Sequence, residues 1–198
     1  MTFGLILIIL VVILVLWLVS IYNTLVRLKN QVKNAWGQID VQLQRRYDLI
    51  PNLIETVKGY MTYEKSTLEA VIQARSQASG ARERIQAEEG VPSADAMKEL
   101  ISAETVLQGT LPKIFALAEN YPQLRASENM AQLQEELRTT ENQVAFARQA
   151  YNDQVMQYNT TQEQFPAVMV ARMFGHSPGE LYKVEEEQAK KAVKVSFS

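Results

Sequence analysis

The stretch from Phe3 to Ile21, FGLILIILVVILVLWLVSI, contains no charged residue and constrains the fold more than any other feature. Its nineteen residues would span about 28 Å as an α-helix, close to the thickness of a bilayer's hydrocarbon core. The sequence therefore predicts a transmembrane anchor over residues 1–22. A cleaved signal peptide is the alternative, but no basic segment precedes the run and no A-x-A-like site follows it. We expect the anchor to be retained.

The residues around the apolar run predict its orientation. Trp17 and Tyr22 occupy positions typical of aromatic side chains at the membrane surface. Arg27, Lys29 and Lys33 follow within a few turns, whereas no basic side chain precedes the run. Because positive residues favour the cytoplasmic side, we expect the N-terminus outside and the remaining chain in the cytoplasm.

Beyond the anchor, apolar residues recur at the three-to-four spacing of amphipathic helices, with almost no alternation of the kind strands show. The pattern falls into four segments, whose apolar positions begin at Leu25, Leu53, Leu100 and Met130. Four such helices joined by short connections predict an all-α fold, an antiparallel four-helix bundle over residues 23–163. A short C-terminal helix and an extended tail are expected over residues 164–198.

Composition excludes several classes of function. The chain of 198 residues has no cysteine, which rules out disulfides, thiolate catalysis and thiolate zinc sites. Its net charge of −2 does not provide the basic surface that nucleic-acid binding requires. A di-iron bundle needs Glu-x-x-His on two helices, and the chain has one histidine, His176, in an expected loop. We therefore expect no metal, no cofactor and no nucleic-acid partner.

The segment RRYDLIPNLIETVKGY, residues 45–60, is the strongest candidate for an active site. Two interpretations are open, acid-base or phosphate chemistry and a simple junction between two helices. The junction is favoured, because arginines complement the C-terminal end of a helix, a proline stops it and an aspartate caps the next one. The residues of this expected helix-junction motif are Arg45, Arg46, Asp48, Pro51, Asn52 and Glu55.

A Tyr-Asn dipeptide occurs three times, and in an up-and-down bundle all three copies would lie near the membrane end. We expect the amides and phenols to form a polar layer that fixes helix register, since buried asparagines can specify alignment. The alternative is that the asparagines simply face water. The proposed layer comprises Tyr22, Asn23, Tyr151, Asn152, Tyr158 and Asn159.

Two C-terminal segments are candidates for contacts. The first, FPAVMVARMFG, predicts a short helix that emerges close to the lipid surface and lies on the membrane, on a neighbouring subunit or on its own bundle. Its apolar residues are Phe165, Val168, Met169, Met173 and Phe174. The second, VKVSFS, alternates as a strand does and could pair with another chain through Val193, Val195 and Phe197.

The motif YNTLVRLKNQVKNAWGQIDVQLQRRYDLIPNLIETVKGYMTYE resembles the signature of the LemA family of bacterial membrane proteins. The likeness continues through LAENYPQLRA, LQEELRTTENQVAFARQAYNDQVMQYN and FPAVMVARMFG, and so covers nearly the whole chain. The resemblance implies a single N-terminal anchor in the bacterial inner membrane and an antiparallel helical bundle. It supplies no catalytic residues, and relatives in magnetosome-forming bacteria suggest a link to membrane organisation.

Three functions fit these observations. The preferred one is a non-enzymatic single-pass membrane protein that self-associates as a scaffold for membrane or membrane-protein complexes. The second is an adaptor or sensor that presents a client to a membrane protease or a stress-signalling system. It needs an exposed surface for a membrane-protein partner, for which the acidic outer face and the corner at Arg45 and Arg46 are candidates. The third, an enzyme using Asp48 and Glu55, is the weakest, because neither a G-x-S-x-G turn nor a phosphate-binding loop accompanies these carboxylates.

Overall fold

The protein is all-helical over the residues that the structure describes. The structure, a computed structural model, covers residues 2–60, 64–88 and 90–183. Its six helices are α1 (Thr2–Lys58), α2 (Lys65–Ala87), α3 (Ala94–Ala118), α4 (Pro122–Arg125), α5 (Glu128–Glu163) and α6 (Ala167–Met173). No strand occurs in these ranges, so the predicted all-α class is confirmed.

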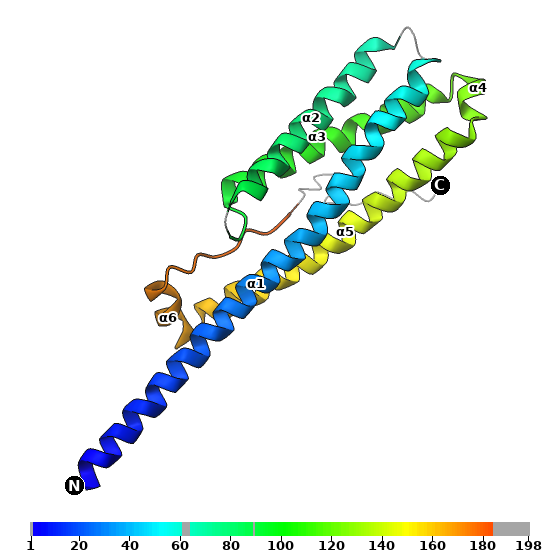
Figure 1. Cartoon of the computed structure of the whole chain (residues 1–198). Helices are drawn as coiled ribbons and strands as arrows, with labels where there is room; N and C mark the ends of the chain where they lie inside the picture. The colour runs from blue at the N-terminus through cyan, green and yellow to red at the C-terminus, as the bar shows by residue number, and fades with distance from the viewer. Residues whose placement is uncertain (1, 61–63, 89, 184–198) are drawn as a thin grey trace, which may run out of the picture.

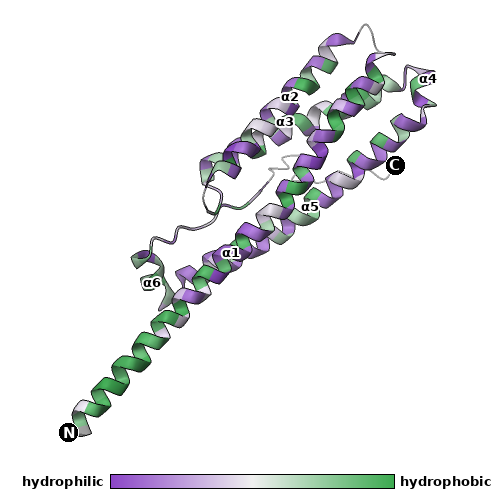
Figure 2. Ribbon diagram, in the orientation of Figure 1, coloured by the Kyte–Doolittle hydropathy of each residue, from purple (hydrophilic) through white to green (hydrophobic). Residues whose placement is uncertain are grey.

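Helix α1 is a single helix of 57 residues, and its N-terminal part projects beyond the remaining elements (Figure 1). Figure 2 shows this projecting part as predominantly hydrophobic, whereas the rest of α1 mixes hydrophobic and hydrophilic residues. The apolar part is long enough to cross a membrane, and none of its most apolar window is buried against the protein. No break in the helix separates it from the part that packs in the helical domain.

The long helices pack in two pairs, α1 beside α5 and α2 beside α3 (Figure 1). The C-terminal half of α1 also contacts α2, so one continuous apolar core joins both pairs. The expected apolar stripe on α1 is buried throughout, from Leu25 to Leu43, and α5 contributes its stripe from Met130 to Tyr158. A smaller cluster joins α6 to α1 near the point where α1 leaves the domain.

The expected end of a helix at Pro51 is wrong, because α1 continues through Pro51 to Lys58. Helix α2 begins seven residues after that end, at Lys65. A proline removes the hydrogen bond to the carbonyl four residues earlier, which here belongs to Tyr47. That carbonyl accepts a hydrogen bond of 2.9 Å from Nε of Arg75 on α2. Buried Ile50, Leu53 and Ile54 flank the proline and hold both sides of it in the core.

We predict that Arg75 and Pro51 are energetically coupled. Arg75→Ala should lower the free energy of unfolding by about 1–3 kcal/mol, since the Tyr47 carbonyl then lacks a partner. In a Pro51→Ala background the new N–H can bond that carbonyl, so Arg75→Ala should cost at least about 1 kcal/mol less. Urea unfolding of the four variants measures the coupling. Arg84→Ala on the same helix serves as the control, and equal costs of Arg75→Ala in both backgrounds would refute the coupling.

Candidate functional site

An extended segment, residues 176–182, runs back along α5 from the end of α6, and we call it the strap (Figure 1). Two asparagines of α5 bind the backbone of the strap, each through both the nitrogen and the oxygen of its side-chain amide. Asn159 donates to the carbonyl of Gly179 at 2.9 Å and accepts from the Gly179 N–H at 2.8 Å. Asn152 donates to the carbonyl of Tyr182 at 3.2 Å and accepts from its N–H at 2.8 Å. At these two residues the strap backbone is therefore hydrogen-bonded through both its N–H and its carbonyl, as it would be beside a neighbouring β-strand.

The spacing of the two asparagines matches the spacing of the two strap residues. Seven residues of helix advance about 10.5 Å. Three residues of extended chain advance about 10 Å. Because the higher-numbered asparagine binds the lower-numbered strap residue, the strap is antiparallel to α5. Two asparagines one heptad apart on a helix can thus bind an extended backbone at two residues without strain.

The strap lies between α5 and the connection from α2 to α3. A Cβ atom added to Gly179 would approach Cγ1 of Val91 to 3.0 Å and Cγ1 of Val155 to 3.3 Å. Glycine is therefore the residue that fits this close passage. Further along the strap, Tyr182 is buried in the main core. The strap consequently tethers α6 to the core of the domain.

Two tyrosines of α5 complete the attachment of the strap. The Tyr151 hydroxyl donates to the carbonyl of Glu180 at 2.9 Å, and the Tyr158 hydroxyl lies 2.9 Å from Nδ1 of His176. Burial raises the pKa of both phenols, so they remain protonated donors. Burial, together with the charge of Lys29, lowers the pKa of His176. A neutral imidazole can accept the Tyr158 hydrogen bond.

The expected polar layer of three Tyr-Asn pairs is therefore wrong. The amides of Asn152 and Asn159 bind the strap backbone, and Asn23 is exposed. Tyr22 instead packs its ring against Phe174, with ring centroids 4.7 Å apart. The α5 copies of the repeat do make specific hydrogen bonds, but their partner is a backbone segment some twenty to thirty residues further along the chain.

Helix α6 packs where the apolar part of α1 ends. Val170 and Ala171 are buried against Leu25 and Ile21 of α1, and Val168 is half-buried. The opposite side of this segment is apolar and exposed. Its four large side chains are Phe165, Met169, Met173 and Phe174.

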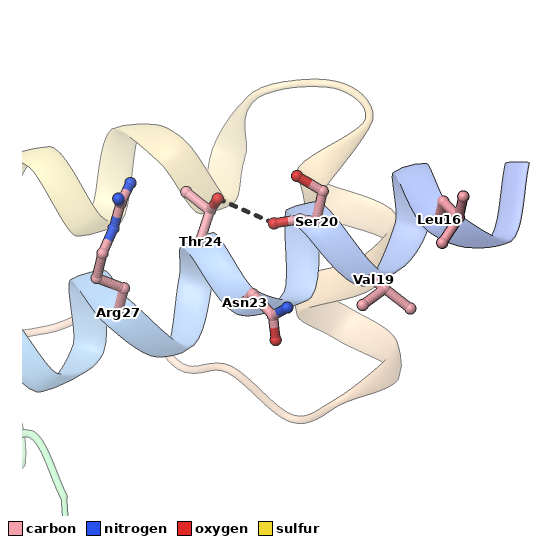
Figure 3. A pocket seen from close by; sticks show the side chains of 6 residues that line it. All are labelled: Leu16, Val19, Ser20, Asn23, Thr24 and Arg27. Carbon is pink, nitrogen blue, oxygen red and sulfur yellow. Dashed lines mark hydrogen bonds between the residues drawn. The ribbon is translucent and has the colours of Figure 1, made fainter. Parts of the chain in front are cut away.

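A hollow of about 420 Å³ lies on α1 at the same level. It passes from Leu16 and Val19 of the apolar part to the polar Asn23, Thr24 and Arg27, as Figure 3 shows. Thr24 donates a hydrogen bond of 2.9 Å to the carbonyl of Ser20. The hollow therefore marks the change from apolar to polar surface along α1.

The helix-junction residues have different environments from those expected. Arg45 and Arg46 lie inside α1 rather than in its last turn. Arg46 is buried and forms an ion pair of 2.6 Å with Glu104 of α3, which also accepts from the Tyr47 hydroxyl. Burial raises the pKa of Glu104, and Arg46 opposes that rise. The segment thus forms a structural ion pair between two helices.

The carboxylates proposed as alternative catalytic groups are exposed. Asp48 accepts a hydrogen bond of 2.7 Å from Gln44 within α1 and caps no helix. Glu55 forms an ion pair of 3.8 Å with Lys58, and Asn52 is exposed one turn earlier. Over the described ranges, no group of three His, Cys, Asp or Glu side chains is placed to hold a metal ion.

Sequence reasoning missed the charged groups that join the helices. Besides Arg46 and Glu104, Arg82 of α2 binds Asp40 of α1 through two hydrogen bonds of 2.6 and 3.0 Å. Heptad position alone does not distinguish these side chains from exposed charges. The tail residues Val193, Val195 and Phe197 lie outside the described residues.

Comparison with known proteins agrees with the resemblance noted in the sequence. The chain is 27% identical to "Protein LemA" of Metamycoplasma hominis over 87% of this chain and 71% of that protein. It is 22% identical to magnetosome proteins MamQ 1 and MamQ 2 of Paramagnetospirillum magneticum, over 82% of this chain and 64% of each relative. The model of the LemA family matches residues 35–197. With most of its length matched, the chain belongs to the LemA family.

Proposed function

We propose that the protein is a non-enzymatic, single-pass protein of the bacterial inner membrane that self-associates as a scaffold for membrane or membrane-protein complexes. The continuity of α1 carries the proposal: one unbroken helix contains both the apolar segment and the main core stripe. A domain joined rigidly to its anchor holds a fixed position at the membrane. The likeness to two magnetosome proteins supports a role in organising membrane or membrane-protein complexes.

The proposal includes an antiparallel four-helix bundle built from α1, α2, α3 and α5. The shared core and the alternating directions of these helices in Figure 1 support this arrangement. With the basic residues Arg27, Lys29 and Lys33 beyond the apolar part, we place the bundle in the cytoplasm. The exposed surface then provides contacts for other copies.

We also propose that the exposed side of α6 lies on the lipid surface. Phe174 contacts Tyr22, the residue that directly follows the apolar run, so this side is held at the level where the bilayer ends. Exposed Phe and Met side chains stabilise insertion into the boundary between headgroups and acyl chains. Arg172 of α6 and Arg27 of α1 are exposed at the same end, where they can meet lipid phosphates.

The substitution Phe174→Trp tests this contact. In a variant whose own tryptophans, Trp17 and Trp36, are replaced by phenylalanine, we expect brominated lipids to quench the fluorescence of the introduced indole strongly. Phe146→Trp in the same background is the matched control, because Phe146 is exposed on α5. Quenching at position 174 no greater than at position 146 would show that α6 does not touch lipid.

The mass of the full-length protein in mild detergent tests self-association. The chain has a mass of 22.4 kDa, and we expect a uniform particle several times heavier by light scattering corrected for detergent. Monomers or dimers alone would contradict the scaffold. Monomers that co-purify with a stoichiometric membrane protein would favour the adaptor function instead.

A further inference from the structure

A groove of about 600 Å³ runs between α1 and α5, and none of its lining residues is charged. It is lined by Asn34, Gly37, Gln38, Val41, Gln42, Gln143, Phe146, Ala147 and Ala150. The hollow between α2 and α3 differs, because Arg84, Asp95, Lys98 and Glu99 line it. Charged residues are depleted from the centres of protein interfaces and abundant on solvated surfaces. The α1–α5 groove therefore has the composition of an interface.

The groove has large exposed apolar side chains at its edge and open space over a glycine inside it. Phe146 is 73% exposed and Val41 is 62% exposed, so two large apolar side chains stand in solvent beside it. A Cβ added to Gly37 would meet nothing within 4 Å, so the space above this glycine is empty. Glycine inside a helix costs about 0.5–1 kcal/mol relative to alanine, and the internal packing of the chain does not require it here.

We propose that this α1–α5 face pairs with the same face of a second copy, Phe146 of each copy entering the groove of the other. The proposal rests on self-association and names one of the surfaces through which the copies pair. Two anchors in one bilayer hold both α1 helices in the same direction. Phe146 itself lines the groove beside Gly37 and Val41, so it lies at the height of the partner's groove.

The absence of charge favours a second copy over a different protein. A two-fold contact brings each surface against itself, so any net charge on the face would repel its own image. An uncharged groove avoids that repulsion. Confinement of both copies to one membrane raises their effective concentration, so the pairing does not need the area of about 800 Å² per partner that is usual in a standard interface.

Disulfide trapping in native membranes tests the pairing directly, because the chain has no cysteine of its own. Val41→Cys and Phe146→Cys chains carrying different tags are expressed together and oxidised. We expect a heterodimer linked between positions 41 and 146. Val106→Cys, 49% exposed on α3, replaces Val41→Cys as the control and should give no such product. Equal linking with the control, or linking only to another protein, would overturn the proposal.

Filling the groove separates pairing from folding. Gly37→Leu occupies open space on a helix, so the variant should fold at least as stably as the parent while dimerisation weakens about thirty-fold, as for loss of a hot-spot aromatic. Gly109→Leu on α3 also enters open space and is the matched control. Dimerisation in detergent-free nanodiscs is read by energy transfer. Unchanged transfer in Gly37→Leu with an assembled parent would overturn this face alone, whereas an unassembled parent would overturn self-association as well.

Discussion

Replacement of Arg46 by methionine is expected to lower the free energy of unfolding by about 3–5 kcal/mol, because it leaves the Glu104 carboxylate buried without its cation. The side chains of Arg46 and Glu104 are 3% and 1% exposed. Arg84 and Glu99 form an ion pair of the same 2.6 Å length, but their side chains are 69% and 44% exposed. Arg84→Met should therefore cost less than about 1 kcal/mol. Urea unfolding of the two variants in detergent provides the comparison.

A second substitution distinguishes loss of a partner from loss of packing. Arg46→Met combined with Glu104→Met should recover most of the lost stability, since neither charge then remains buried. If the double variant is no more stable than Arg46→Met, the guanidinium contributes chiefly through packing and the ion-pair account fails.

The dependence of this effect on pH follows from the raised pKa of Glu104. Burial raises that pKa above the ordinary value of 4.5, so the folded protein binds the proton more tightly than the unfolded chain does. The resulting stability is fully present below pH 4.5 and is lost as the pH rises through the folded pKa. Without Arg46, which lowers this pKa, the Arg46→Met variant should regain stability on acidification from neutral pH. The double variant should lack that response.

Asn159→Leu is expected to release the strap while leaving the helices folded. The substitution removes two hydrogen bonds to Gly179, and their loss should make strap opening about 30-fold to 150-fold more frequent, equivalent to about 2–3 kcal/mol. The readout is hydrogen exchange at the Tyr182 amide, whose own acceptor, Asn152, is unchanged. Faster exchange there shows that the two asparagines hold the strap cooperatively.

The control for the strap prediction lies on the same helix. Asn129 is exposed near the start of α5, and Asn129→Leu should leave exchange at Tyr182 unchanged. If Asn159→Leu also leaves that exchange unchanged, the two attachment points open independently. The strap would then be a set of separate contacts rather than one unit.

The sequence predicted the helical class and most of the apolar core, because apolar residues at three-to-four spacing fall on one face of a helix, and that face is the one buried. Leu25, Leu28, Val32, Ile39 and Leu43 all lie in the core as their spacing predicts. The prediction failed where a distant group changes a local rule. Pro51 should end a helix, and it does not because an arginine 24 residues away serves the carbonyl it leaves free.

The candidate site was only partly accessible to sequence reasoning. The repeated Tyr-Asn dipeptide identified the α5 residues that matter, but their partners are backbone atoms of the strap, which have no side-chain signature. Gly179 was the one available hint, since a glycine in an otherwise extended segment can indicate a close backbone approach. Arg46 and Glu104 carry no mark of burial in the sequence, because each occupies a helix among many other charged residues.

The unbroken course of α1 from its apolar part into the domain has a mechanical consequence. The 37 residues from Tyr22 to Lys58 continue the same helix for about 55 Å beyond the apolar run. Transmembrane helices tilt when the bilayer becomes thinner than their apolar length. A tilt of about 10° would swing the far end of such a lever by about 10 Å. In a protein built this way, local bilayer thickness would set where the far end of the helical domain points.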